Sequence, residues 1–258
     1  MTVHADTNTD TAAAAVSQAI RARRSARDFL PTPIPQDLLN AVLQDANQAP
    51  SWSNTQPYRI AIASGPVRDR LQTELTHRFD QGMAAQRGSW CGGCWGKLKL
   101  LASPGAMPDG DYKVNIDYPE ALQPRRRATG HGLYAMLGIG RKDHAAREAQ
   151  MRRNFEFFGA PTAIFVFVHS GLREFSVLDA GIFIQTLMLS AHAHGLGTCA
   201  QGALATWGGP VRAAFDVPKD YKLICGLSIG YPSTHPINAF NPGRAEVAAL
   251  MIRASLSI

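Results

Sequence analysis

The spacing of hydrophobic positions predicts a series of helices along the chain. At residues 35–47, apolar side chains recur on one face and Pro35 stands in the first turn, as is typical of an amphipathic helix. Residues 175–194 are apolar nearly all round and precede Gly195, which predicts a buried central helix ended by a glycine. Further helices are expected at residues 11–24, from Pro66 onwards, at 124–138 and at 143–157.

Short apolar segments between these helices predict strands. Residues 58–63 alternate between apolar and polar side chains as in a half-buried strand. Residues 162–169 form a continuous run of β-branched and aromatic side chains, which is expected of a strand buried on both faces. Two further short strands are expected at 198–202 and 223–229.

Residues 80–122 differ from the rest because they are rich in glycine, contain tryptophan and show no regular spacing. A long irregular stretch in a compact domain is commonly a lid or a substrate loop, or is disordered. We expect an insertion that serves as a lid or substrate loop. No repeat or flexible linker divides the remaining sequence. Residues 11–258 are therefore expected to form a single domain that follows a disordered tail at 1–10.

The composition narrows the class of protein. Hydrophobic residues make up 45% of the 258 residues, but no eighteen of them are consecutive, which argues against a transmembrane span. Residues 1–20 lack the basic start of a secretory signal. Four cysteines are too few for a disulfide framework in a chain of this length, so we expect a cytoplasmic protein. The net charge of +6 permits anion binding, although the basic clusters have no interleaved aromatic residues that would indicate a nucleic-acid surface.

Two short motifs point to a ligand that is planar and carries a phosphate. The R-R-S-x-R sequence at 23–27 places three guanidiniums and a hydroxyl within five residues, and arginine is the side chain best suited to bind phosphate in a fork. The P-S-x-x-N-x-Q-P sequence at 50–57 is a polar loop whose amides can read the edge of a polar ring. A plainer interpretation is a basic helix end that complements the helix dipole, together with a loop that stops a helix before a strand.

The two motifs resemble those of the FMN-dependent nitroreductase family, in particular its oxygen-insensitive, nitrobenzoate-reductase-like members. The G-L-G-T-C-A-Q-G sequence at 195–202 agrees with this resemblance, as do G-Y-P at 230–232 and N-P-G-R at 241–244. The resemblance covers about residues 15–250. It implies an α+β sandwich, in which a mostly antiparallel central sheet is flanked by helices. It also implies an intertwined homodimer whose C-terminal arm crosses to the partner.

The resemblance also implies which residues hold the cofactor. Arg23, Arg24 and Ser25 would bind the phosphate and ribityl chain of FMN, while Arg27 would lie near the N1–C2=O edge and stabilise negative charge on the reduced flavin. The residue that contacts flavin N5 is left open between Gln201 and Gly202. The remaining members implied for the site are Ala200, Arg244 and, reaching the flavin of the other subunit, Pro50, Ser51, Trp52, Asn54 and Gln56.

The activity that the resemblance implies is ping-pong electron transfer from NADH or NADPH through FMN to nitroaromatic acceptors, with no protein side chain as the catalytic acid. A reductive dehalogenase would carry a lid glutamate followed four residues later by tyrosine, and then a lysine. Here Glu120 is followed by Pro124, and the next lysine is Lys142. The sequence is also compatible with a free-flavin reductase of the same superfamily and with a non-catalytic flavin- or nucleic-acid-binding protein.

The acceptor is expected to meet the aromatic residues of the irregular stretch. Arg126, within the basic cluster at 125–127, could attract a carboxylated acceptor such as nitrobenzoate or the phosphate of NADPH, and a solvated helix start is the alternative. Cys91 and Cys94 form a C-x-x-C pair without a second pair, so we expect no metal site. The aromatic candidates for the substrate wall are Trp90, Trp95, Tyr112 and Tyr118.

Overall fold

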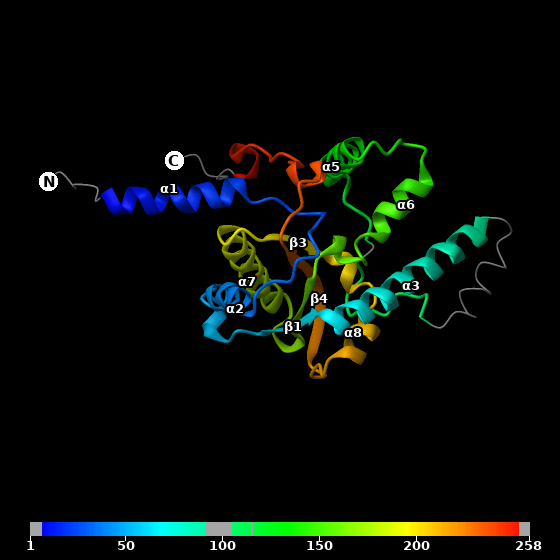
Figure 1. The fold of residues 1–258 in the computed structure, drawn as a ribbon, viewed down its shortest axis with the longest axis horizontal. Coiled ribbons are helices and arrows are strands. Elements are labelled where there is room, and N and C mark those ends of the chain that lie inside the picture. The colour runs from blue at the N-terminus through cyan, green and yellow to red at the C-terminus, as the bar shows by residue number, and fades with distance from the viewer. Residues whose placement is uncertain (1–6, 91–104, 115, 253–258) are drawn as a thin grey trace.

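The computed structural model describes residues 7–90, 105–114 and 116–252, and these build helical layers around one antiparallel sheet (Figure 1). Its strands lie in the order β1-β2-β4-β3. They are β1 (Tyr58–Ser64), β2 (Thr162–His169), β3 (Gly197–Gln201) and β4 (Tyr221–Gly230). The helices are α1 (Thr7–Ala22), α2 (Gln36–Ala46), α3 (Gly65–Trp90), α5 (Gln123–Met136), α6 (His144–Arg152), α7 (Arg173–Ala193) and α8 (Gly208–Ala214).

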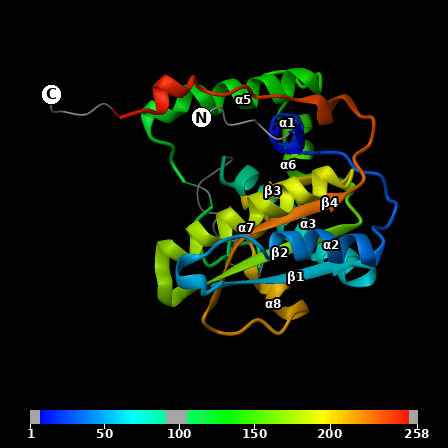
Figure 2. The ribbon, with the colours of Figure 1, turned by 90° about the vertical axis from the view of Figure 1, so that its left-hand side faces the viewer.

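Strand β2 supplies side chains to two separate cores because helices cover both faces of the sheet. Phe165 and Phe167 belong to the core beneath α3 and α8, whereas Ile164 and Val166 belong to the core beneath α2 and α7. Figure 2 shows α2 and α7 together on one side of the sheet. The continuous apolar run in the sequence therefore reflects a strand that is buried on both faces.

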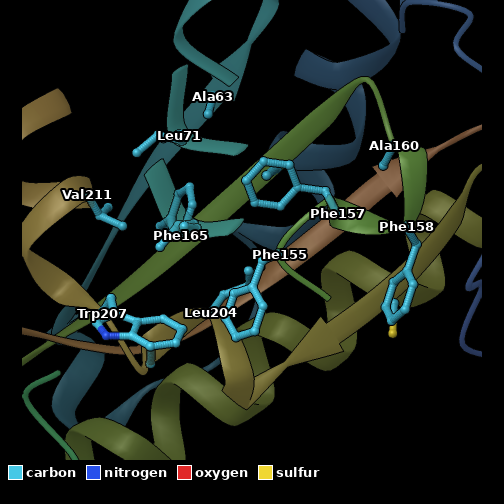
Figure 3. Packing of buried hydrophobic residues seen from close by; sticks show 14 of the residues in the cluster. Ala63, Leu71, Phe155, Phe157, Phe158, Ala160, Phe165, Leu204, Trp207 and Val211 are labelled. Carbon is cyan, nitrogen blue, oxygen red and sulfur yellow. The ribbon is translucent and has the colours of Figure 1, made fainter. Parts of the chain in front are cut away.

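Aromatic rings dominate the core beneath α3 and α8 (Figure 3). The ring of Phe155 packs against Phe79 at 5.2 Å and edge-on against Trp207 at 5.1 Å. Phe157 is fully buried and meets Phe165 at 6.2 Å in a T-shaped arrangement. Each such ring buries a large apolar area, so this cluster is a main source of stability for the layer.

The start of α1 and the end of α3 differ from the expected boundaries. Helix α1 begins at Thr7, so residues 7–10 are helical although the sequence predicted a disordered tail there. Helix α3 continues to Trp90, so the first part of the stretch predicted to be irregular is also helical. Tertiary contacts explain the extension, because Ala85 is buried and two ion pairs tie this part of α3 to α6.

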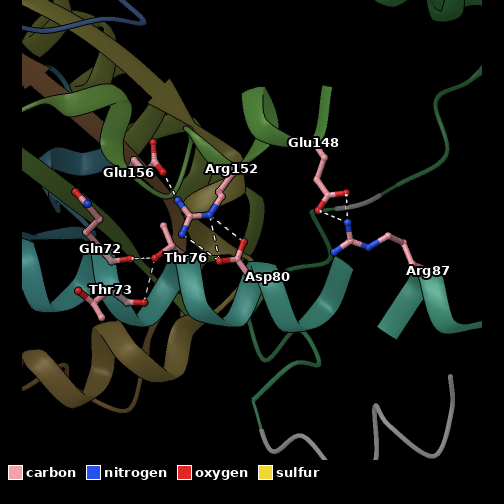
Figure 4. A network of polar contacts seen from close by, with 8 residues as sticks. All are labelled: Gln72, Thr73, Thr76, Asp80, Arg87, Glu148, Arg152 and Glu156. Atoms are coloured by element: carbon pink, nitrogen blue, oxygen red, sulfur yellow. Dashed lines mark hydrogen bonds and ion pairs between the residues drawn. The ribbon is translucent and has the colours of Figure 1, made fainter. Parts of the chain in front are cut away.

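Figure 4 shows the polar contacts between α3 and α6. Arg152 donates to both carboxylate oxygens of Asp80, with Nε–Oδ1 at 2.9 Å and Nη2–Oδ2 at 3.0 Å, and it also contacts Glu156. Arg87 pairs with Glu148 at 3.3 Å further along α3. A two-pronged arginine–carboxylate contact fixes orientation as well as distance, so α6 is held at a defined place on α3.

Helix α6 is shorter than the expected 143–157 because the chain turns after Arg152. Phe157 and Phe158 both have a φ of 54°, which side chains other than glycine rarely adopt. The turn places both rings in the core, where they are 0% and 3% exposed. Burial of two aromatic side chains therefore compensates for a strained backbone.

Helix α7 lies on the sheet, but only one side of it is covered. Phe183 and Leu187 are buried against the sheet, while Phe175 is 45% and Leu178 59% exposed. Gly195 has a φ of 77° and ends the helix, as the sequence predicted. Within the described residues, the helical stretch Ser170–Ala193 is long and apolar enough, by length and composition alone, to span a membrane. Of its most apolar part, 39% is buried inside the protein. Its buried side packs as a core helix does.

Candidate functional site

The arginine motif follows α1 and lies along the edge of β3. Ser25 forms a parallel bridge with Thr198, and the N–H of Ala26 donates to the Thr198 carbonyl at 3.0 Å. This close approach requires the glycine at the start of β3, because a Cβ on Gly197 would lie 2.8 Å from the Ala26 Cβ. Arg27 lies close enough to Cys199 in β3 to act electrostatically on its thiol. The fold thus places the 23–27 motif beside the strand that carries the 195–202 motif.

Arg244 lies near the arginines of this motif. It belongs to the C-terminal arm, which is the part of the chain that follows β4. Burial, then Arg244 and Arg24, hold the pKa of Arg23 below its usual value, so these charges lie close together. In the part of the chain that the structure describes, none of the four arginines (Arg23, Arg24, Arg27, Arg244) forms an ion pair with a carboxylate. A group of cations without acidic partners favours the binding of an anion, and a phosphate fits this donor set.

Cys199 lies beside this cluster and is inert. Burial raises its pKa to about 11, although Arg27 and Arg23 oppose the shift. A thiol with such a pKa stays protonated at neutral pH and is a poor nucleophile. The sequence interpretation of the site, which assigns no role to this cysteine, is compatible with this environment.

The end of β3 presents two exposed residues and one buried one. Gln201 is only 4% exposed, and its Nε2 donates to the Asn154 carbonyl at 2.9 Å while its Oε1 accepts from Ser228. Its side chain is therefore engaged inside the protein and cannot read a ligand. Ala200 and Gly202 are exposed, which leaves this short stretch of backbone as the surface available to a planar ring.

The polar loop at 50–57 is held by hydrogen bonds within the loop and by one to Asp179 of α7. The N–H of Trp52 donates to Oδ2 of Asp179 at 3.1 Å, and Asp179 itself is 2% exposed. Ser51 Oγ accepts from the N–H of Gln56 at 3.0 Å, and Gln56 Nε2 donates to Asn54 Oδ1 at 2.7 Å. The side-chain amides of Asn54 and Gln56, which are predicted to bind the cofactor, are therefore held in place before a ligand binds.

The same loop has an unusual backbone and an exposed aromatic tip. Ser53, Asn54 and Gln56 have φ values of 50°, 54° and 45°, which cost energy for residues with a Cβ. Trp52 is 53% exposed and packs on Phe175 of α7, with ring centroids 4.4 Å apart. A strained loop that presents an exposed ring is typical of a surface that receives a ligand or a partner.

The two predicted groups lie at opposite corners of the sheet. The polar loop leads into β1 at Tyr58, which pairs with Val168, whereas the arginine segment pairs with Thr198, which is in register with Ile229 and Thr162. Six residues of strand correspond to about 20 Å, and the three strand spacings between the two edges add about 14 Å across the sheet. A single chain therefore does not bring the two groups together.

Residues 105–114, which belong to the stretch predicted to form a lid, are anchored beside β4. Asp111 Oδ2 accepts from the N–H of Leu223 and from Arg212, both at 2.7 Å. Burial opposes ionisation of Asp111, but these hydrogen bonds and the charges of Arg212 and Lys222 lower its pKa. The N–H of Gly110 donates to the Thr206 carbonyl at 3.0 Å. Residues 105–114 are thus fixed near the exposed end of β3.

A basic cleft of about 980 Å³ lies between α3, α5 and α6. Arg126 lines it and stacks over the ring of Tyr118 at 4.8 Å, which joins two of the predicted substrate residues. Tyr112 is 37% exposed in the anchored segment. The side chain of Trp90 is not described, and Trp95, Cys91 and Cys94 lie outside the described residues. No cluster of metal-ligating side chains occurs in the described ranges.

Sequence patterns alone missed several polar residues that shape the site. Asp28 and Asn238 join the arginine segment to the C-terminal arm, and Asp179 holds the polar loop. Of these residues, Asp179 alone could have been recognised from the sequence, because it is an acid within a mostly apolar helical stretch. Such an acid usually has a buried partner.

The sequence model of the nitroreductase family matches residues 20–88 and 114–231 of this chain. The chain belongs to the nitroreductase family. It is 33% identical over 220 residues to a 4-nitrobenzoate reductase of Nocardioides sp. (strain LMS-CY), covering 84% of this chain and 81% of the relative. It is 32% identical over 237 residues to nitroreductase NfnB of Mycolicibacterium smegmatis (strain ATCC 700084 / mc(2)155), covering 92% and 91%. The predicted family is confirmed.

Solved structures confirm the predicted fold. The crystal structure of the FMN-dependent nitroreductase NfnB from Mycobacterium smegmatis in complex with NADPH superimposes with a TM-score of 0.79 at 31% identity, covering 94% of this chain and 99% of that one. The FMN and NADPH-dependent nitroreductase NfnB from sphigopyxis sp. strain HMH also gives a TM-score of 0.79, at 27% identity, covering 93% and 99%. The nitroreductase-like α+β sandwich is therefore the fold of this family member.

Proposed function

We propose that this protein is an FMN-dependent oxidoreductase that transfers electrons from NADH or NADPH to nitroaromatic acceptors. The observation that carries the proposal is the group of four arginines at the edge of β3, which has no carboxylate partner in the described ranges. These arginines match a phosphate-bearing cofactor. Relatives named as nitrobenzoate reductase and as FMN-dependent nitroreductase support the choice of cofactor and acceptor.

Each part of the site has a proposed role. Arg23, Arg24 and Ser25 would hold the FMN phosphate, assisted by Arg244, and Arg27 would place a positive charge near the ring. FMN, when bound, supplies the two-electron chemistry. The protein binds and orients the two substrates in turn and covers them from water, so no side chain is assigned to proton transfer.

Purification and steady-state kinetics test the proposal. The purified protein should be yellow, and its oxidation of NADH or NADPH should accelerate when 4-nitrobenzoate is added. A colourless protein that cannot be loaded with FMN would overturn it. Chloride release from a chlorophenol would identify a dehalogenase, turnover with free flavin alone a flavin reductase, and salt-sensitive binding to duplex DNA without turnover a binding protein.

We further propose a homodimer in which each flavin site takes residues from both subunits. The arginine segment and the polar loop lie at opposite corners of one sheet, so a second chain is needed to bring them together. Trp52, Phe175 and Leu178 form an exposed apolar surface on α7 and the neighbouring loop. An apolar surface on a central helix suits an obligate interface.

Mixing two damaged chains tests the shared site. One chain carries Arg23→Ala and Arg24→Ala, and the other carries Asn54→Ala. If each site uses the arginines of one subunit and Asn54 of the other, a mixed dimer contains one doubly damaged and one intact site. Mixing should then restore up to half of the wild-type activity per mixed dimer. Absence of rescue after proven subunit exchange would show that each site is built within one chain.

A further inference from the structure

Asn238 lies in the short 3-10 helix Pro236–Ala239, which follows β4 and leads into the C-terminal arm. Its side-chain amide joins three points of the backbone. Oδ1 accepts from the N–H of Arg27 at 2.7 Å, while Nδ2 donates to the carbonyl of Asp28 at 2.8 Å and to that of Ser233 at 3.0 Å. One half-buried side chain thus connects the arginine segment to the start of the arm, 211 residues further along the chain.

Asp28 strengthens the same connection, and its carboxylate is paired with Arg153 and Ser233 and not with the arginine cluster. Its carboxylate accepts from Arg153 Nη2 at 2.8 Å and from the Ser233 hydroxyl, and its carbonyl accepts from the Ser233 N–H at 3.0 Å. Burial disfavours its ionised form, but Ser233 and Arg153 outweigh burial and lower its pKa. The acid that follows Arg23, Arg24 and Arg27 directly in sequence is therefore ionised and already paired with Arg153, which leaves the charge of these arginines available to an anion.

The arginines on the two connected segments repel one another. Arg23 and Arg24 belong to the segment on β3, and Arg244 belongs to the arm, yet they lie close enough for Arg244 to act electrostatically on Arg23 within the same chain. The arm itself is exposed around Arg244, whose Nη1 donates only to the neighbouring Gly243 carbonyl among its described contacts. Something must hold the two segments in place before an anion arrives, and preorganisation of this kind is what strengthens binding.

We propose that Asn238 is a positioning residue for the flavin phosphate: it ties the Arg23–Arg27 segment to the C-terminal arm of the same chain so that both sets of guanidiniums face one phosphate. This inference rests on the proposed FMN site. Asn238 does not touch the cofactor. It acts through the backbone of Arg27 and through the start of the arm. Its loss should therefore affect the phosphate end of the ligand, where Arg23, Arg24 and Arg244 are proposed to act, more than the ring, where Arg27 alone is proposed to act.

Comparing FMN with riboflavin isolates that effect, because riboflavin has the same ring and ribityl chain but no phosphate. The affinity of the apo-protein for both is measured by quenching of flavin fluorescence. Asn238→Ala removes three hydrogen bonds, so it should weaken FMN binding about tenfold or more and riboflavin binding by about threefold at most. Asn238→Asp has the same shape and keeps the acceptor for Arg27, but it places a negatively charged oxygen opposite the carbonyls of Asp28 and Ser233, so it should weaken FMN binding at least as much.

Asn40→Ala is the matched control, because Asn40 is an exposed asparagine on α2 whose side chain bonds only to Gln36 among the described contacts. It should leave both affinities unchanged. Equal losses of FMN and riboflavin affinity in both Asn238 variants would assign Asn238 to the fold and overturn the proposal, as would unchanged FMN affinity. A wild-type protein that binds neither flavin would instead refute the proposed function itself, so the two failures are distinguishable.

Discussion

Replacing Gly197 by alanine should displace the segment that carries the arginines. A Cβ at this position would lie 2.8 Å from the Cβ of Ala26, 3.2 Å from that of Pro232 and 3.3 Å from Cε1 of Phe29. Carbon atoms pack best at about 3.5–4.0 Å, so the contact with Ala26 is short by about 1 Å. The Ala26 methyl group is attached directly to the backbone and cannot rotate away. The 23–29 segment must therefore move off β3.

The expected cost follows from the kind of overlap. An extra methyl in a close-packed interior destabilises a protein by about 1–3 kcal/mol. For a domain of this size each kcal/mol lowers Tm by about 2–4 °C, so Gly197→Ala should unfold about 2–12 °C below wild type. Thermal and urea unfolding of the apo-protein measure the effect. FMN affinity should fall as well, because the displaced segment carries Arg23 and Arg27.

Two further variants separate this reasoning from a general intolerance of glycine substitution. Gly130 lies inside α5 and a Cβ there would meet no heavy atom within 4 Å, so Gly130→Ala should leave stability equal to wild type or up to about 1 kcal/mol higher. Adding Ala26→Gly to Gly197→Ala should recover part of the lost stability, which is a coupling that a double-mutant cycle measures. A Gly197→Ala protein that unfolds at the wild-type temperature would refute the argument.

Two other predictions follow from the lid anchor and the basic cleft. Asp111→Asn should lower the free energy of unfolding by about 1–3 kcal/mol near pH 7, because the hydrogen bonds to an ionised carboxylate are weakened. The pKa of Asp111 is lowered in the folded state, so its contribution is present above about pH 4 and is lost as the pH falls further; urea titrations at pH 7 and pH 3 should show the difference shrinking. Arg126→Ala should reduce kcat/KM for 4-nitrobenzoate about five- to tenfold and leave uncharged nitrobenzene unchanged, whereas Arg125→Ala, outside the cleft lining, should affect neither. Equal losses for both acceptors would show that Arg126 does not recognise charge.

Local sequence patterns were sufficient for much of this protein. The apolar spacing of α2, the continuous run of β2 and the glycine that ends α7 each reflect contacts within one element or on its own faces, so a short window of sequence contains the signal. The arginine motif was equally visible, because three guanidiniums in five residues suit an anion, although the motif by itself also fits a basic helix end. These signals identified the family correctly. The individual roles of the site residues stay predictions.

Tertiary structure decided the features that depend on distant partners. Helix α3 runs to Trp90 because contacts with α6 support residues whose own spacing is irregular. Asp179 reaches the N–H of Trp52 across 127 positions, and Asn238 reaches the carbonyl of Asp28 across 210. Which side chains meet over such separations depends on strand order and register, and a one-residue shift in register would change every partner. Helix periodicity is a local property, whereas the position of a carboxylate or an amide opposite a backbone group is a property of the folded chain.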